Sequence, residues 1–245
     1  MIFYAASDVG KKREKNEDYY DIKTICDNVY LYVIADGLGG YQSGEVASKL
    51  AVDTIIAYFQ NKYEINKKNN VKNILKQAII LANEKIYNLE KTDNKYKGMA
   101  TTIVVLCIVK DKMYYVSIGD SRMYNINEQM TEITQITEDD TYVNALLKTN
   151  IINEMEALNH PQKHMLTKAV GIFNEIDFDI YELKENIDGY FLICTDGVTN
   201  MLDENELLNI FKRNKFENVA EKIIQKANDK GGIDNSTAIV IKKER

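Results

Sequence analysis

The sequence predicts an α+β fold whose largely antiparallel sheets are covered by layers of helices. Short strand-like runs recur along the chain, and several follow each other too closely to leave room for a helical crossover between parallel strands. Two long stretches with helical periodicity lie near the N-terminus, and two more are expected near the C-terminus. Because no Pro-rich, Ser-rich or low-complexity linker interrupts the 245 residues, we expect one domain spanning residues 1–245.

The expected strands are short apolar runs bounded by turn-forming residues. They are Ile2–Ala6, Tyr30–Ala35, Thr101–Val109, Met113–Ile118, Phe178–Leu183, Tyr190–Cys194 and Thr237–Ile241. The expected helices repeat apolar residues at three- and four-residue spacing. They are Gly44–Gln60, Val71–Leu89, Glu204–Lys212 and Glu217–Asn228. Residues about 140–170 are less regular, with weak helical patterning at Tyr142–Leu147 and Asn153–Leu158, and this segment is expected to form a flap.

Composition argues against several classes of protein. Lysine and arginine total 31 while aspartate and glutamate total 37, and this net charge of −6 argues against a nucleic-acid or anionic-membrane binder. The three cysteines, Cys26, Cys107 and Cys194, have no CxxC spacing and look like buried free thiols of a reducing compartment. No signal peptide or membrane helix is evident. We therefore expect a cytoplasmic protein, and a monomer.

Aspartates at the ends of apolar runs are the most informative feature. Asp36, Asp120 and Asp196 each follow such a run and precede a small residue, and Asp234 lies just before the last expected strand. Buried carboxylates are costly without a compensating cation, and like charges repel each other. For a single aspartate, a capping or turn role is the simpler interpretation. Four such residues together favour a site at which they converge on a cation.

The expected cation is Mg²⁺ or Mn²⁺. The chain has only two histidines, His160 and His164, and neither is close in sequence to a cysteine or to one of these aspartates. Zinc sites usually need such nitrogen and sulfur ligands, whereas Mg²⁺ and Mn²⁺ prefer oxygen.

A basic residue and a glycine loop complete the candidate site. Arg13 lies in a loop of mixed charge. Its usual role would be that of a solvated surface charge, but an arginine fork also matches the oxygens of a phosphate. The loop DGLGG from Asp36 lacks the phosphate-binding patterns of nucleotide-binding loops. Its glycines are instead expected to bring the backbone, including the Gly37 carbonyl, close to a metal.

Eight short motifs follow one another through the chain. They are SDVGKKREKNED from Ser7, ADGLGGYQSGEVAS from Ala35, MATT from Met99, IGDSRMY from Ile118, ITEDD from Ile136, HPQKHMLTKAVG from His160, CTDGV from Cys194 and GGIDNST from Gly231. In this order they resemble the metal-dependent protein phosphatase family of type 2C, in particular the compact bacterial Ser/Thr phosphatases. The similarity covers nearly the whole chain, from Ser7 to Ile241.

The resemblance implies a four-layer α-β-β-α sandwich of two antiparallel sheets flanked by helices, with two Mn²⁺ or Mg²⁺ ions at one end and, as in many bacterial relatives, a third. It also implies the role of each matching residue. Asp36 would bridge two ions, the Gly37 carbonyl would bind one of them, and Asp196 and Asp234 would complete the other. Asp120 with Asp196 would hold the third ion, with Asp139 as a weaker candidate. Glu17 and Asp18 would act through metal-bound waters, and Arg13 would hold the substrate phosphate.

The implied activity is that of a serine/threonine protein phosphatase. A water shared by two ions becomes a hydroxide at neutral pH and attacks phosphorus in line, while Arg13 and the ions offset the charge on the phosphoryl oxygens. The substrates would be phosphoproteins, and the partner would be a bacterial Ser/Thr kinase whose phosphorylation the enzyme reverses. Cys194 lacks the CxxxxxR loop of a cysteine phosphatase and is not expected to be a nucleophile.

The chain departs from the family pattern near the site. Leu38 and Tyr41 stand where relatives have histidines, Asp140 stands where they have the histidine that follows Asp139, and Ala100 replaces a glycine. A proton for the leaving group would therefore come from metal-bound water, or the enzyme would prefer good leaving groups; His160 is expected to have a flap-surface or capping role. These departures keep open the alternative of a catalytically weak or inactive module that binds phosphoproteins. A dedicated phosphatase for an anti-sigma antagonist is a third alternative, although such proteins usually carry further regulatory domains.

Overall fold

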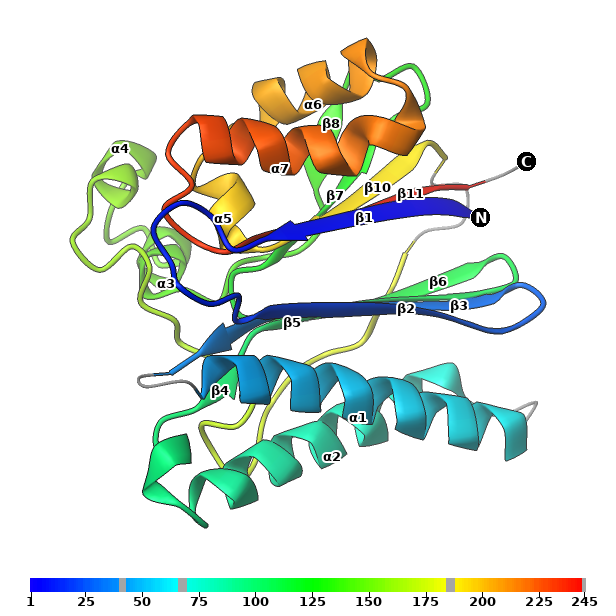
Figure 1. The fold of residues 1–245 in the computed structure, drawn as a ribbon, viewed down its shortest axis with the longest axis vertical. Helices are drawn as coiled ribbons and strands as arrows, with labels where there is room; N and C mark the ends of the chain where they lie inside the picture. The colour runs from blue at the N-terminus through cyan, green and yellow to red at the C-terminus, as the bar shows by residue number, and fades with distance from the viewer. Residues whose placement is uncertain (40–42, 66–69, 184–187, 244–245) are drawn as a thin grey trace.

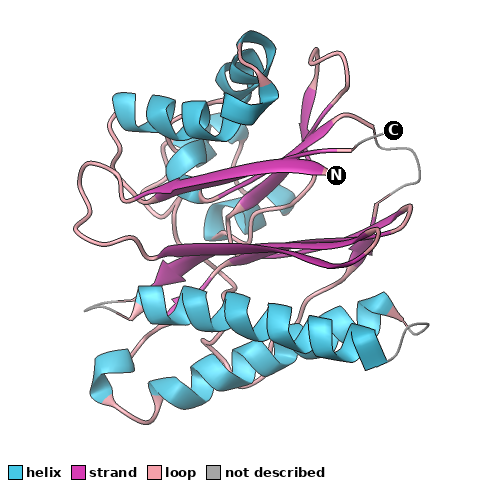
Figure 2. Ribbon diagram, turned by 45° about the vertical axis from the view of Figure 1, so that its right-hand side comes forward, coloured by secondary structure: helices cyan, strands magenta, loops and turns pink. Residues whose placement is uncertain are grey.

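Two antiparallel sheets face each other, and helices cover the outer face of each sheet (Figure 1). The structure is a computed structural model that describes residues 1–39, 43–65, 70–183 and 188–243. Figure 2 shows the two layers of strands between the two layers of helices. The predicted α+β sandwich is therefore confirmed.

The first sheet has the strand order β1-β11-β10-β7-β8. Its strands are β1 (Ile2–Asp8), β7 (Arg122–Ile126), β8 (Ile133–Gln135), β10 (Tyr190–Cys194) and β11 (Ser236–Lys242). The second sheet has the order β2-β3-β5-β6-β9, and β4 also pairs with β3. Its strands are β2 (Asp18–Cys26), β3 (Val29–Leu38), β4 (Ala100–Thr101), β5 (Ile103–Val109), β6 (Lys112–Ile118) and β9 (Tyr181–Glu182).

Each sheet is covered by its own pair of long helices. Helices α1 (Gly44–Ile65) and α2 (Val71–Glu90) cover the second sheet, whereas α6 (Glu204–Arg213) and α7 (Val219–Asp229) cover the first (Figure 1). A capping box fixes the start of α6, because Asp203 accepts a hydrogen bond from the backbone of Glu206 and the Glu206 side chain accepts one from the backbone of Asp203. The short helix α5 (Asp196–Thr199) follows β10 directly. The flap carries α3 (Tyr142–Lys148) and α4 (Glu154–Leu158).

Strand β5 shows how one run of residues serves two cores. Successive side chains of a strand point to opposite faces of the sheet. Ile103, Val105 and Cys107 pack with the residues of α1 and α2, while alternate residues from Val104 onward pack between the two sheets. An uninterrupted apolar run is therefore what a strand buried on both faces requires. A third core lies between the first sheet and helices α6 and α7.

Several elements differ from the prediction. Strands β2, β7 and β8 and helix α5 were not expected, and the predicted strand Phe178–Leu183 pairs only as β9. The predicted strand Thr101–Val109 divides into β4 and β5 at Thr102. Cys107 and Cys194 are buried free thiols as expected, but Cys26 at the end of an edge strand is exposed, so the prediction of burial was wrong for it.

Candidate active site

Five aspartates come together at the end of the sandwich where α3, α4 and α5 lie (Figure 1). Asp18 opens β2 and lies directly opposite Asp36 in β3. Asp120 follows β6, Asp196 opens α5, and Asp234 precedes β11. In an antiparallel sheet, the end of one strand lies beside the start of its neighbour, so both meet at the same end of the sandwich. This is why residues so far apart in the sequence converge.

The charges of these aspartates repel one another strongly. Desolvation raises the pKa of Asp36 well above its ordinary value, and the carboxylates of Asp18 and Asp196 raise it further. Desolvation likewise raises the pKa of Asp120 to about 7, with Asp196 as the next cause. Such carboxylates favour either protonation or a cation placed among them.

Two of the carboxylate oxygens are buried without a hydrogen bond. They are Oδ1 of Asp18 and Oδ1 of Asp196, which have no partner among the described residues. An ionised oxygen that has lost its water and gained no donor is costly. Both atoms therefore suit a site that a divalent cation and its waters would complete.

In the described part of the chain, no three acidic, histidine or cysteine side chains already form a group that could hold an ion between them. Mg²⁺ sites do not require such a group, because the ion keeps several waters and needs only one or two protein carboxylates. The residues thus fit ions that are bound by few side chains, by a backbone carbonyl and by water.

The backbone around Asp36 is fixed by a pair of threonines. The Asp36 amide donates to Thr102 Oγ1 at 3.0 Å, and the Asp36 carbonyl accepts hydrogen bonds from the Thr102 amide at 2.9 Å and from Thr101 Oγ1 at 2.8 Å. The Thr102 hydroxyl is also 2.8 Å from that of Ser121, the residue after Asp120. The motif MATT therefore links the candidate bridging residue to the Asp120 loop.

Gly37 can only be a glycine in this arrangement. A Cβ atom at Gly37 would collide with the backbone carbonyl of Gly44, the first residue of α1. The Gly37 amide donates to the Glu17 carbonyl at 3.1 Å. The close approach of three backbone segments thus explains the glycine pair that the sequence places at these two positions.

Glu17 and Asp18 lie beside the cluster in different environments. Asp18 is buried, and its Oδ2 accepts hydrogen bonds from the hydroxyls of Thr195 at 2.8 Å and Thr237 at 2.7 Å. Desolvation raises the pKa of Asp18 to about 7, although both hydroxyls oppose the shift. The Glu17 carboxylate lies against the start of α1, next to Gly44.

An asparagine that the sequence did not single out ties the N-terminal loop to the cluster. Asn235 is buried, its Nδ2 donates to the carbonyls of Val9 and Lys15, and its Oδ1 accepts from the Glu17 amide. The residue stands in the motif GGIDNST, but its partners are more than 200 positions away, so spacing alone could not reveal its role.

Arg13 lies at the same end of the molecule as the aspartates. Its Nη2 donates to Oδ2 of Asp234 at 2.8 Å, and the two side chains are 49% and 28% exposed. The guanidinium also interacts electrostatically with Glu17 and Asp36. The structure therefore brings the candidate phosphate-binding residue to the candidate metal ligands.

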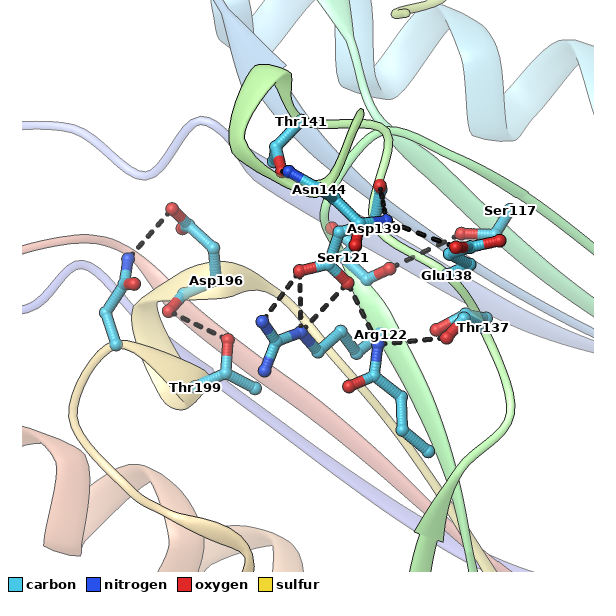
Figure 3. A network of polar contacts seen from close by, with 12 residues as sticks. Ser117, Ser121, Arg122, Thr137, Glu138, Asp139, Thr141, Asn144, Asp196 and Thr199 are labelled. Carbon is cyan, nitrogen blue, oxygen red and sulfur yellow. Dashed lines mark hydrogen bonds and ion pairs between the residues drawn. The ribbon is translucent and has the colours of Figure 1, made fainter. Parts of the chain in front are cut away.

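Asp139 is held by Arg122 rather than left open to an ion. Arg122 Nε lies 3.0 Å from both Asp139 oxygens, its Nη2 lies 2.6 Å from Oδ2, and Gln135 Nε2 donates to Oδ1 at 2.9 Å (Figure 3). The Asp139 side chain is only 14% exposed. Binding an ion at Asp139 would require this bidentate pair to open, which leaves Asp120 with Asp196 as the better pair for a third ion.

Asp140 joins the flap to the end of β6. Its Oδ2 accepts from the Gly119 amide at 3.2 Å, and its own amide donates to the Gly119 carbonyl at 2.9 Å. The Asp140 carbonyl accepts from the Thr167 amide at 2.8 Å on the far side of the flap. The carboxylate that departs from the family pattern thus orders the residue before Asp120.

The two histidines have different surroundings. His160 Nδ1 accepts from the Gln162 amide at 3.1 Å, in the turn that follows α4. His164 lines the same cavity as Asp120 and Asp196. Desolvation is the main cause that raises the pKa of Asp196, Asp234 adds to it, and His164 acts in the opposite direction. His164 is therefore a site residue that the sequence did not single out.

Two of the departures from the family pattern are less informative here. Leu38 pairs with Ala100 across β3 and β4, so both serve the sheet at the site's edge. Tyr41 lies outside the described residues. No side chain that would replace the relatives' histidines is therefore identified at these two positions.

Comparison with known proteins identifies the class. The model of the family "Protein phosphatase 2C" matches residues 10–234. The serine/threonine phosphatase stp of Listeria welshimeri is 31% identical over 97% of this chain and 94% of its own, and protein phosphatase PhpP of Streptococcus pneumoniae is 34% identical over 96% and 94%. The chain belongs to the protein phosphatase 2C family, and its class of enzyme is that of serine/threonine phosphatases.

Solved structures agree with this assignment. The serine/threonine phosphatase PstP/Ppp of Mycobacterium tuberculosis is similar with a TM-score of 0.88 and 29% identity, over 100% of this chain and 99% of that one. Stp1 of Staphylococcus aureus has a TM-score of 0.88 and 32% identity, over 99% and 95%. A catalytic domain of PstP, with a TM-score of 0.82, 27% identity and coverage of 98% and 96%, was solved in complex with two manganese ions.

Among the described residues, none of the helices combines the length and the hydropathy needed to span a membrane.

Proposed function

We propose that this protein is a Mn²⁺- or Mg²⁺-dependent phosphatase that hydrolyses phosphoserine and phosphothreonine in proteins. The observation that carries the proposal is the convergence of Asp18, Asp36, Asp120, Asp196 and Asp234 at one end of the sandwich. The pKa is raised for the first four of these, and Asp18 and Asp196 each have a buried oxygen without a partner among the described residues. Relatives that are named serine/threonine phosphatases, and a similar structure in complex with two manganese ions, support it.

The residues would divide the work between holding ions and holding substrate. Asp36 would bridge two ions, the Gly37 carbonyl would bind one, and Asp196 and Asp234 the other. Asp120 with Asp196 would hold a third ion, while Glu17 and Asp18 would accept hydrogen bonds from bound waters. A pair of metal ions held in this way would supply an acidified water as the nucleophile and would offset charge on the phosphoryl oxygens.

Arg13 would orient the phosphate. Its guanidinium lies within reach of Asp234 and is half-exposed, so it can turn from that carboxylate to a phosphate that arrives from solvent. The cation at this position would then stabilise the charge that develops on the equatorial oxygens.

The cellular setting is part of the same proposal. The substrates would be proteins that a bacterial Ser/Thr kinase has phosphorylated, and the enzyme would act in the cytoplasm as a monomer with one catalytic domain over residues 1–245. The alternative of an inactive phosphoprotein-binding module rests on the substitutions at Leu38, Tyr41 and Asp140. Against it, every position that would bind a metal ion in this family holds a suitable residue in this chain.

The test is phosphate release from a phosphothreonine peptide in Mn²⁺, Mg²⁺, Ca²⁺ or EDTA. Wild type is compared with Asp36→Asn and with Asp111→Asn, which removes an exposed carboxylate in the turn between β5 and β6. We expect turnover that requires Mn²⁺ or Mg²⁺, that is lost in Asp36→Asn and that is retained in Asp111→Asn. A folded protein that binds Mn²⁺ but turns over no phosphopeptide would instead favour the binding module.

A further inference from the structure

A large cavity opens beside the candidate active site. It has a volume of about 910 Å³ and lies between the flap helices α3 and α4 and the body of the molecule around α5 and the start of α6. This volume is in the range of ligand-binding pockets, about 300–1,000 Å³. Asp120 and Asp196 line the cavity. When the phosphate of a substrate protein binds at the aspartate cluster, the substrate residues that flank the phosphorylated residue would therefore lie beside the cavity.

Most of the charged side chains that line this cavity are acidic. The carboxylates that line it are Asp120, Glu138, Asp139, Glu154, Asp196 and Glu204. The cationic side chains that line it are Arg122 and Lys163, with His164 as a third when it is charged. Without Asp120 and Asp196, which the proposed ions would neutralise, four carboxylates remain against Arg122, Lys163 and a charged His164, and this balance favours a positively charged group.

The six carboxylates differ in their partners. Asp139 is neutralised by Arg122, and Glu138 pairs with Lys148 at 2.7 Å. Asp120 and Asp196 belong to the proposed ion site. Glu154, in the first turn of α4, and Glu204, in the first turn of α6, are exposed and make no ion pair with any described residue.

The positions of Glu154 and Glu204 place one acidic group on each wall. Glu154 belongs to the flap, whereas Glu204 belongs to the helix that covers the first sheet (Figure 1). Both residues line the same cavity from different elements. Figure 3 shows the polar contacts among Arg122, Asp139 and Asn144, which also line the cavity.

Apolar side chains complete the cavity. Val143, Leu147, Ala157 and Leu158 line it, and Leu158 is 72% exposed although it is a large hydrophobic residue. Lysine and arginine carry a charged head on an aliphatic stem that packs along such surfaces. A bare metal ion would make no use of them, so the lining fits a basic side chain better.

We infer that this cavity receives a lysine or arginine side chain that flanks the phosphorylated residue of the protein substrate, with Glu154 and Glu204 as its recognition residues. The inference rests on the proposed function and names the substrate class within it: phosphoserine and phosphothreonine sites in basic sequence. The attraction between partly exposed charges is screened by salt, so the preference decreases as ionic strength rises.

The test compares two phosphothreonine peptides that differ only in flanking arginines or flanking citrullines, which are nearly isosteric and neutral. Wild type, the double variant Glu154→Gln/Glu204→Gln and the control Glu217→Gln, an exposed carboxylate away from the cavity, are assayed in Mn²⁺. We expect wild type and the control to prefer the arginine peptide roughly 2- to 30-fold in kcat/KM, as two partly exposed ion pairs allow. The double variant loses this preference, and Glu154→Lys/Glu204→Lys reverses it.

Two further measurements separate this inference from the proposed function. p-Nitrophenyl phosphate has no flanking residues, so the double variant hydrolyses it at the wild-type rate. Peptide binding by fluorescence anisotropy needs no turnover, and a preference for arginine there that depends on both glutamates supports the cavity assignment even if no phosphate is released. Equal binding of the two peptides, or a preference that survives in the double variant, would overturn the inference.

Discussion

Replacing Asp120 by Asn is expected to stabilise the metal-free protein at neutral pH. The pKa of Asp120 is raised from an ordinary value of 3.8 to about 7, mainly by desolvation and then by Asp196. A carboxyl group whose pKa is higher in the folded than in the unfolded state costs the fold nothing below the unfolded pKa. As the pH rises from there through the folded pKa, the free energy of unfolding falls, because the unfolded state loses its proton more readily. The loss therefore develops between about pH 4 and pH 7.

The size of the effect follows from that shift. About three pKa units correspond to an upper limit of about 4 kcal/mol, at 1.36 kcal/mol per unit. Because Asp120 is partly exposed and shares its repulsion with neighbouring carboxylates, we expect about half of this, roughly 2 kcal/mol. For a protein of this size, 1 kcal/mol changes Tm by about 2–4 °C, so the variant should melt roughly 4–8 °C higher than wild type.

Thermal melts in EDTA at pH 4.5 and pH 7.0 measure the difference. The variant Asp120→Asn should exceed wild type at pH 7.0, and the gap should shrink at pH 4.5, where the folded carboxyl is protonated. Asp111→Asn, in an exposed turn, should show no gap at either pH. Adding Mn²⁺ should stabilise wild type more than the variant. If Asp120→Asn melts at or below the wild-type temperature in EDTA at pH 7.0, the argument from repulsion among buried carboxylates is refuted.

Three other outcomes are expected. Mn²⁺ should raise Tm relative to EDTA, because ions offset the repulsion among the aspartates, and an unchanged melt would contradict a convergent site. Arg13→Ala should raise KM for a phosphopeptide more than it lowers kcat, and steady-state kinetics with an unaltered KM would remove Arg13 from phosphate binding. Asn83→Ala should lower the free energy of unfolding by about 1–3 kcal/mol in urea melts. The reason is that the buried side-chain amide of Asn83 forms hydrogen bonds with the backbone of Gly171, Phe173 and Asn174. A smaller loss than in an exposed-site control would show that water replaces these hydrogen bonds.

The strands that the sequence predicted correctly are those with uninterrupted apolar runs. Strand β5 is buried on both faces, so every residue contributes to the pattern. Strand β7 was missed because its first residue is Arg122, whose charge is tolerated in the sheet only through the pair with Asp139. The Arg122–Asp139 ion pair joins two separate segments, so no short stretch of sequence reveals it. Strand β2 lies at a sheet edge with mixed exposure, which blurs its alternation.

The predicted strand Phe178–Leu183 was mostly wrong for a different reason. Phe178 and Ile180 pack against the core under α1 and α2, so they are apolar for packing and not for strand pairing. Only Tyr181 and Glu182 pair, with β6. A short apolar run reports burial, and burial alone does not specify backbone hydrogen bonds.

Asp18 was found only through the resemblance to the family. Asp36, Asp120, Asp196 and Asp234 could be found from sequence, because each follows or precedes an apolar run and strand ends gather at one end of the sandwich. The groups that hold them could not. Thr102 supports Asp36 and also contacts Ser121, and Asn235 supports Glu17, so each link joins segments that only the folded chain brings together. The engagement of Asp139 by Arg122 belongs to the same class of long-range contact.

The anchoring of the flap has a consequence for how this enzyme can diverge. Thr141 bridges Leu166, and the Asp140 carbonyl binds the Thr167 amide, so the segment between them leaves and re-enters the body at one point. Doubling the length of a loop with fixed ends costs only about 0.6 kcal/mol in closure entropy. Insertions, deletions and charge changes between these anchors that spare His164 are therefore expected to leave the aspartate cluster intact. Substrate choice and phosphate hydrolysis can evolve as separate modules of one chain.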